Sequence, residues 1–277
     1  MGTFTSICAA IRTSAERYSG TRKRPWLIIN QDGTDRLNRE MLSLETVGSF
    51  KRGQSLYYYQ SLPAAELGEL RDDRVGPGDL YVRLVNASKD LWRPELVFVW
   101  ARSRERGIVP LALETDMTPG LSGTRREGTL SGPVRRVSAG GDEMPIRRLL
   151  MIVLTYDAPY AGTDDPIFLR ISTPERTLVH HEVTDTPQTD LEMNTANVYW
   201  LPVAHPFTRA ELRYDGSEVR LGILGSDMWV PKKVYVFGVD RISERPESVV
   251  SLARVIEPGP LSVDPSEGVP SVRLSLE

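Results

Sequence analysis

The chain has 277 residues, of which 40% are hydrophobic and 26% charged, and its formal net charge is −3 at pH 7. This length predicts two domains, and so small a net charge excludes a general attraction to nucleic acid, so we expect no nucleic-acid partner. The one cysteine, Cys8, excludes an internal disulfide framework. No apolar run approaches the ~18 residues of a membrane-spanning helix and no signal peptide is recognisable, so we expect a cytoplasmic protein, alone or within a larger particle.

Residues 1–24 differ in composition from the rest of the chain. Phe4, Ile7, Cys8 and Ile11 have the i, i+3, i+4, i+7 spacing of one helix face, and a basic cluster follows them. We therefore predict a basic, weakly amphipathic arm or short helix, which either packs on its own domain or tethers the protein to a lipid surface or an assembly. The residues expected to form the tether are Phe4, Ile7, Ile11, Arg22, Lys23 and Arg24.

From Trp26 onward the sequence is typical of β-structure. Short apolar segments such as WLIIN, LYVRLV and PIFLRI alternate with turns rich in Gly, Pro, Asn and Asp. Many short strands at close spacing favour sandwiches or barrels. We predict an all-β protein with two tandem antiparallel β-sandwich domains, at residues 25–137 and 147–277, joined by a small polar linker at 138–146.

An internal repeat supports the two-domain prediction. Segments 79–102 and 218–240 align without a gap at a spacing of 137 residues, and the alignment pairs Asp90 with Asp227 and Trp92 with Trp229. The segments that follow, from Leu111 and from Leu252, are also alike, and Leu121 aligns with Leu261 at a spacing of 140 residues. A repeat of half the chain indicates that the two sandwiches arose by internal duplication.

The second half of the chain resembles a known domain family. AGTDDPIFLRI from Ala161, an acidic turn after it and EVRLGILGSDMWVPKKVYVFGV from Glu218 resemble the PLAT (LH2) domain, over about residues 149–240. The resemblance implies an eight-stranded antiparallel sandwich that docks on membranes or partner proteins, in some members through bound Ca²⁺. Residues 25–137 look like a degenerate copy, with NQDGTDRLN at 30–38 in place of the AGTD loop.

Acidic residues in two loops of the second half are candidate calcium ligands. Hard cations bind carboxylate and carbonyl oxygens, and the resemblance implies that the loop at Gly162 lies near Asp227. Asp and Gly are also common turn residues in loops that bind no metal. The candidate ligands are Asp157, Asp164, Asp165 and Asp227, and a second, less favoured set in the first half is Asp32, Asp35 and Asp90.

Trp92 and Trp229 have two interpretations. Each follows an acidic turn and precedes an alternating strand, so each is a candidate contact for a lipid surface or a protein partner. The alternative is that each indole closes the end of a sandwich with its N–H satisfied internally. The repeat favours the second interpretation, because Trp92 is retained where its neighbours have changed.

Catalytic motifs are not apparent. The three histidines, His180, His181 and His205, lack the spacing of a zinc helix, and there is no nucleophile elbow or phosphate-binding glycine loop. We therefore predict a non-catalytic interaction protein that docks on a protein partner, a second copy or a lipid surface. The alternatives are a structural subunit of a larger assembly, such as a shell, spike or injection apparatus, and a hydrolase with an unrecognised Asp/Glu pair.

Overall fold

Strands form nearly all of the regular structure in the described part of the chain, and they belong to two units. The computed structural model describes residues 3–17, 19–41, 47–62, 70–75, 79–124, 128–183, 191–240 and 248–277. Unit 1 is Met1–Ala139 and unit 2 is Gly140–Glu277, so the division falls inside the segment predicted as a linker. The described ranges contain no α-helix and only one short 3-10 helix, η1 (Ala210–Arg213). The expectation of an all-β protein is confirmed.

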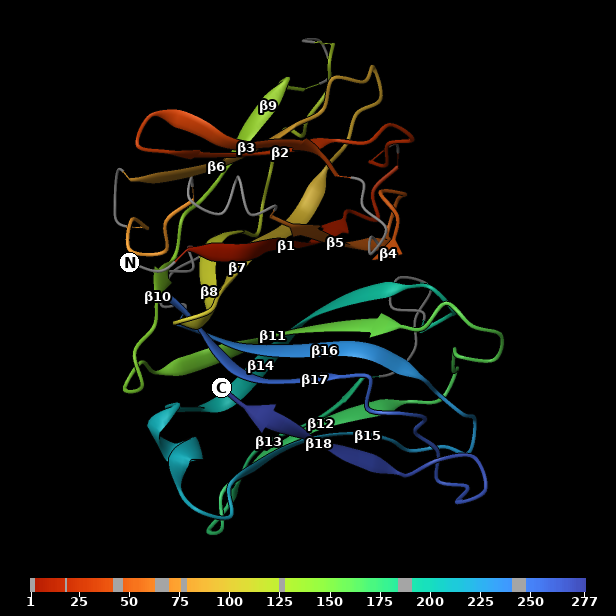
Figure 1. Ribbon diagram of the computed structural model, residues 1–277. Coiled ribbons are helices and arrows are strands. Elements are labelled where there is room, and N and C mark those ends of the chain that lie inside the picture. Colours follow the sequence, from red (N-terminus) through yellow and green to blue (C-terminus); the bar gives the residue numbers. More distant parts are fainter. Residues whose placement is uncertain are drawn as a thin grey trace. The chain divides into compact units, whose positions relative to one another are not determined.

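Unit 1 has two antiparallel layers (Figure 1). In the first layer the strands lie in the order β4-β5-β1-β7-β8, and in the second in the order β3-β2-β6-β9. The strands of unit 1 are β1 (Phe4–Thr13), β2 (Trp26–Gln31), β3 (Thr34–Glu40), β4 (Val47–Gly48), β5 (Ser55–Ser61), β6 (Leu80–Val85), β7 (Pro94–Ser103), β8 (Gly107–Glu114), β9 (Ser131–Val134) and β10 (Ser138–Ala139).

Unit 2 repeats this topology, except that β4 and β10 have no counterpart among its described strands. One layer has the order β14-β11-β16-β17 and the other the order β13-β12-β15-β18. The layers join at one edge, where Ala253 of β17 pairs with Leu276 of β18. The strands of unit 2 are β11 (Ile146–Thr155), β12 (Ile167–Ser172), β13 (Thr177–Val183), β14 (Ala196–Phe207), β15 (Glu218–Ile223), β16 (Pro231–Asp240), β17 (Ser248–Ile256) and β18 (Ser271–Leu276).

Each unit encloses its own hydrophobic core between its two layers. In β6 the side chains of Leu80, Val82 and Leu84 are buried while that of Tyr81 is 49% exposed, which is the period-2 pattern of a strand with one face inward. β15 contributes Val219 and Leu221 to the core of unit 2 in the same way. The alternation that predicted these strands therefore comes from a real division between core and solvent.

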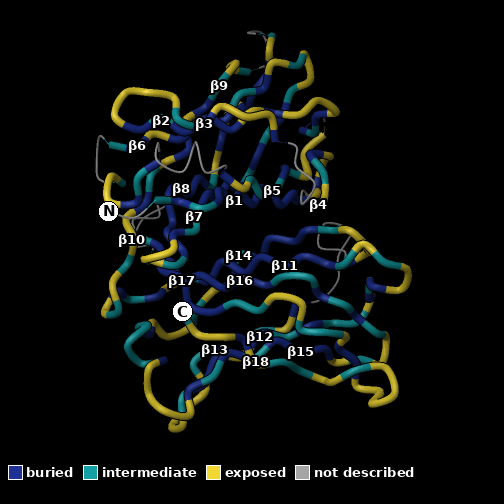
Figure 2. The backbone as a smooth tube through the Cα atoms, viewed as in Figure 1, coloured by how far each residue is buried: buried dark blue, intermediate teal, exposed yellow. Residues whose placement is uncertain are grey.

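The N-terminal segment is not an arm, and the predicted helix is wrong. β1 lies between β5 and β7, and Phe4, Ile7 and Ile11 are at most 1% exposed within the core of unit 1. Cys8 lies on the opposite face of the strand and is buried too, so nearly all of β1 is dark blue in Figure 2. A strand buried on both faces has no polar alternation, and its apolar residues also fit a helical spacing. The three apolar residues are therefore unable to act as a tether.

Candidate functional site

Trp92 and Trp229 occupy the same place at the end of each core. Both side chains are fully buried, and their indole Nε1–H groups donate hydrogen bonds of 3.1 and 3.2 Å to the Oγ1 atoms of Thr13 and Thr155. The prediction that these tryptophans contact a partner or lipid is wrong. They close the sandwich end, with a threonine hydroxyl as the internal acceptor, because a buried indole N–H needs one.

The segment after β8 in unit 1 and the segment after β17 in unit 2 help to close the same end of each core. The backbone of Trp92 exchanges two hydrogen bonds with Leu121, at 2.8 and 2.7 Å, and that of Trp229 exchanges two with Leu261, at 2.9 and 2.7 Å. This explains why the sequence repeat continues past the paired strands. The repeated residues include those whose backbone hydrogen bonds hold Trp92 and Trp229 at the end of each core.

Two loops meet at this end of unit 2, and aspartates tie them together. The Asp164 N–H donates to Asp227 Oδ2 at 3.3 Å, and the Asp227 N–H donates to Asp165 Oδ2 at 2.8 Å. Thr163 Oγ1 accepts the Asp165 N–H at 3.0 Å. Each loop therefore supplies an acceptor to the other's backbone, and the sequence correctly predicted that Asp164, Asp165 and Asp227 lie near one another.

The tied loops form one wall of an acidic cleft of about 1020 Å³. The described side chains that line it include no Lys, Arg or His. Nearby Asp264 favours its negative form, because hydrogen bonds from Ser266 lower its pKa. The carboxylates that line the cleft are Asp164, Asp165, Glu192, Asp227 and Glu267.

This geometry gives the calcium hypothesis no support. Asp165 and Asp227 already accept backbone N–H groups, and Asp157 is exposed and does not line the cleft. Within the described ranges, no group of three or more His, Cys, Asp or Glu side chains is arranged to hold a metal ion. We therefore interpret the aspartates as the ties between two loops.

Unit 1 has the same loop with the opposite charge. Arg22 N–H donates to Asp90 Oδ2 at 3.3 Å, and Lys23 N–H donates to Thr21 Oγ1 at 3.1 Å, which repeat two of the bonds described for unit 2. A constant spacing of 142 residues relates this loop to its counterpart and pairs Thr13 with Thr155, Thr21 with Thr163, and Arg22 with Asp164. Basic side chains therefore stand where unit 2 has acidic ones.

The sequence interpretation placed this loop wrongly. Residues 30–38, taken as the substitute for the AGTD loop, contain the tight turn between β2 and β3, where Asp32 and Gly33 have φ of 54° and 78°. Asp32 pairs with Arg74 and Asp35 with Arg83, both outside the Trp92 end. The matching Gly-Thr of residues 20–21 could have been found from its position just before a strand.

Neighbouring loops add cations to the basic loop of unit 1. The Thr21 N–H donates to the Phe50 carbonyl oxygen at 3.1 Å, which brings the turn at 51–52 beside it, and Thr21 Oγ1 lies 3.2 Å from Ser88 Oγ. Six exposed cations result, none with an ion-pair partner among the described residues. We call this set the basic end of unit 1: Arg22, Lys23, Arg24, Lys51, Arg52 and Lys89.

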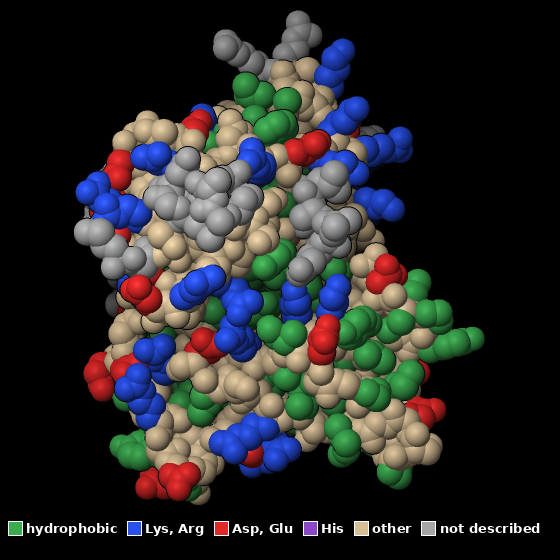
Figure 3. Space-filling model, viewed as in Figure 1, with side chains coloured by type: hydrophobic (Ala, Val, Ile, Leu, Met, Phe, Trp, Pro, Cys, Tyr) green, Lys and Arg blue, Asp and Glu red, His purple; other side chains and the backbone are tan. Residues whose placement is uncertain are grey.

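The two units also differ in overall charge. Unit 1 has 21 Lys and Arg against 16 Asp and Glu, a formal charge of +5, and unit 2 has 13 against 21, a formal charge of −8. In Figure 3, Lys and Arg side chains stand out at several places on the visible face of unit 1. The small net charge of the whole chain therefore conceals two units of opposite sign.

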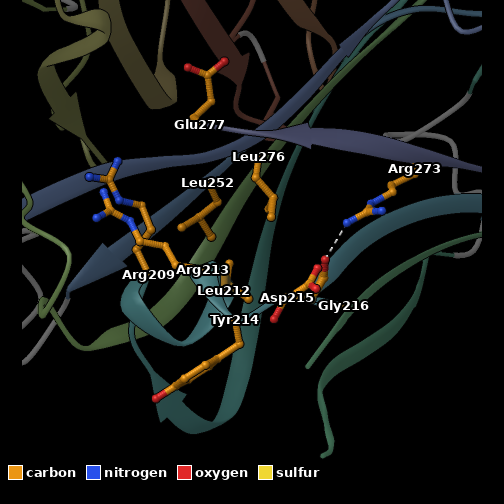
Figure 4. Close-up of a pocket in the computed structure, with 11 residues that line it drawn as sticks. Arg209, Leu212, Arg213, Tyr214, Asp215, Gly216, Leu252, Arg273, Leu276 and Glu277 are labelled. Atoms are coloured by element: carbon orange, nitrogen blue, oxygen red, sulfur yellow. Dashed lines mark hydrogen bonds between the residues drawn. The ribbon is translucent and has the colours of Figure 1, made fainter. Parts of the chain in front are cut away.

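A second cavity, of about 320 Å³, lies in unit 2 beside η1 (Figure 4). Its arginines are engaged within the fold: Arg209 and Arg213 bind Asp142 at 2.6 and 2.7 Å, and Arg273 donates to the Ser217 carbonyl oxygen at 2.8 Å. These contacts anchor the turn after β14, so we interpret the cavity as structural.

The histidines do not converge on a site. His180 is exposed on β13, where its ring lies 5.8 Å from that of Phe168, and His205 is exposed on β14. His181 is half-buried on β13, opposite Leu169. They are polar residues on strand surfaces.

Comparisons with known proteins give a distant structural likeness. No known family pattern matches the chain, and no curated protein matches it. A solved structure of the alpha toxin from Clostridium absonum is similar over 49% of this chain and 33% of that chain, at 18% identity and a TM-score of 0.35. The chain thus spans about a third of that toxin's length, and the likeness is too slight to carry an argument. No helix within the described ranges is long and apolar enough to cross a membrane.

Proposed function

We propose that this chain is a non-catalytic interaction protein made of two tandem PLAT-like sandwiches that arose by internal duplication. It docks on a protein partner or a lipid surface through the loop ends near Trp92 and Trp229. This extends the resemblance of residues 149–240 to the whole chain, because both units have the same strand order.

One observation carries the proposal. The two units retain the interactions that fix the loop end, including the indole to threonine bond and the aspartate to backbone bond, but they differ in the charge of the loop side chains. Packing is kept and the exposed surface is changed. That is the pattern of a scaffold that presents different binding surfaces at one position.

The absence of a catalytic arrangement among the described residues is consistent with this function. The carboxylates of the acidic cleft include two that accept backbone N–H groups, and the three histidines lie apart on strand surfaces. A general acid or base acts from a defined position beside its substrate. Because two of the carboxylates hold loop backbone and the histidines lie apart, we favour a hydrolase least of the three functions.

A structural subunit of a larger assembly is the second candidate. The observation that favours it is the opposite charge of the two units, +5 and −8, because surfaces of opposite sign on one chain allow copies to associate with one another.

The docking function is tested by measuring association of the wild-type chain and of the variant R22E/K23E/R24E. Two readouts are needed: molar mass in solution as a function of concentration, and co-sedimentation with vesicles containing anionic lipid. We expect wild type to associate in at least one assay and the variant to lose that association with an unchanged unfolding midpoint. A wild-type chain that stays monomeric at all concentrations and does not co-sediment with vesicles would contradict the proposal.

A further inference from the structure

We infer that the basic end of unit 1 binds the acidic cleft of unit 2 in a second copy of this chain, so that copies associate head to tail. The inference rests on the proposed function and names its partner. The partner is a second copy because the chain carries both members of a complementary pair, at corresponding places in its two units.

The charges on each side are suited to this contact. Within the part of the chain that the structure describes, the basic end has six exposed cations without ion-pair partners, and the acidic cleft is lined by five carboxylates and no cation. A surface with unpaired charges of one sign repels a surface of the same sign and attracts a surface of the opposite sign. Association of two identical ends, basic with basic or acidic with acidic, is therefore disfavoured.

The loops that carry these charges are held in defined conformations before any partner binds. Asp90 fixes the backbone of the basic loop at Arg22, and Asp227 fixes that of the acidic loop at Asp164, each at 3.3 Å. In both loops a threonine hydroxyl fixes the next residue as well. Loops that are already ordered lose less conformational entropy when they bind, which favours association.

The apolar side chains of the acidic cleft add contact area. Tyr160 is 87% exposed and Met193 is 47% exposed, and both line the cleft. Aromatic residues and methionine are enriched at protein interfaces, and guanidinium groups stack on aromatic rings. The arginines of the basic end are therefore suited to the ring of Tyr160 as well as to the carboxylates.

The contact joins two different surfaces, so it is heterologous. After two copies pair, one of them keeps an unused acidic cleft and the other keeps an unused basic end. A heterologous contact gives a ring when its rotation closes and a filament when it does not. We therefore expect an assembly that grows with concentration and dissociates in high salt, because ions screen exposed charges.

The test uses the full chain and two charge-reversal variants with sedimentation velocity at low and high salt. The first variant, R22E/K23E/R24E, cancels the positive charge of the basic end, because its three glutamates lie beside the remaining Lys51, Arg52 and Lys89. The second, Asp164→Lys with Glu192→Lys and Glu267→Lys, makes the cleft basic and leaves the tying carboxylates of Asp165 and Asp227 in place. We expect wild type to self-associate at low salt, and each variant alone to associate about tenfold more weakly or worse.

An equimolar mixture of the two variants is the decisive sample. The acidic cleft of the first variant and the basic end of the second variant are both unchanged, so these two surfaces can bind one another. We expect association through this contact to be restored in the mixture. The matched control is Arg104→Glu against Lys23→Glu: both change one exposed cation of unit 1, but Arg104 lies at the turn after β7, at the strand end away from Arg93.

Each outcome decides between the proposals. Restoration in the mixture, with Arg104→Glu behaving as wild type, supports head-to-tail association. A wild-type chain that stays monomeric at low salt, or variants that assemble as well as wild type, would overturn it. A monomeric wild type that still sediments with anionic vesicles, and loses this with R22E/K23E/R24E, contradicts self-association while the docking function stands.

Discussion

The indole Nε1–H of Trp229 donates a hydrogen bond of 3.2 Å to Thr155 Oγ1, and both side chains are buried. We expect Thr155→Val to lower the free energy of unfolding of unit 2 by about 1 to 3 kcal/mol, because the indole N–H is left without an acceptor. Chemical denaturation followed by tryptophan fluorescence measures this. Thr177→Val, at an exposed position of β13, is the control and should have little effect. Equal effects of the two changes would show that the bond contributes nothing.

The position of Asp165 depends on a glycine in the opposite loop. A Cβ built on Gly225 would lie 1.9 Å from Asp165 Oδ2, so Gly225→Ala must displace the carboxylate that accepts the Asp227 N–H. We expect a loss of about 1 to 3 kcal/mol of stability in unit 2, measured by thermal or chemical unfolding. Gly141→Ala is the control, because nothing lies within 4 Å of its added carbon. A tolerated Gly225→Ala would mean that the two loops are not tied.

Ile7 distinguishes a core strand from an arm. Because its side chain is fully buried in β1, we expect Ile7→Ala to destabilise unit 1 by about 2 to 5 kcal/mol. Lys23→Ala, at an exposed position, should change stability by no more than about 0.5 kcal/mol. The measurement is the denaturant midpoint of each variant. An Ile7→Ala variant with an unchanged denaturant midpoint would indicate that residues 4–13 form a peripheral arm and not a core strand.

Tyr58 makes the stability of unit 1 depend on pH in the alkaline range. Burial raises the pKa of Tyr58 to about 12, above its ordinary value of 10.0. Between these values the unfolded chain releases the phenol proton and the folded chain keeps it, so stability falls as pH rises from about 10 to 12, by no more than about 3 kcal/mol. Below pH 10 the residue has no such effect. We expect Tyr58→Phe to lose this slope, measured as the difference from wild type at each pH.

Calcium provides a direct test of how the aspartates act. A cation that binds only the folded state would stabilise it by about 2.7 kcal/mol at a hundred times its dissociation constant. Because Asp165 and Asp227 already accept backbone N–H groups, we expect the unfolding midpoint to be the same with excess Ca²⁺ and with chelator. A midpoint that rises with Ca²⁺, and no longer does so in Asp164→Asn, would restore the metal interpretation.

The repeat of β6 and β7 as β15 and β16 was predictable from the sequence. Both copies retain the alternation of apolar residues, and both retain an Asp and a Trp between the two strands. The all-β class followed from the same strands. β1 was not predictable, because burial on both faces removes the period of 2. The basic loop was missed for a different reason: interpretation relied on the acidic residues of AGTD, whereas the backbone geometry depends on Gly20, Thr21 and the distant Asp90.

The bond from Asp90 to the Arg22 N–H has a consequence for how this protein can change. Asp90 accepts its hydrogen bond from the main chain, so the bond does not depend on the side chain at position 22. A segment whose path is set from outside tolerates almost any solvent-facing sequence, in the way that hypervariable loops do on an immunoglobulin framework. The loop end can therefore change its binding partner while its backbone stays the same: exchanging the exposed Arg22 and Asp164 between the units, with Asp165 kept in place, should change what each unit binds and leave both folds intact.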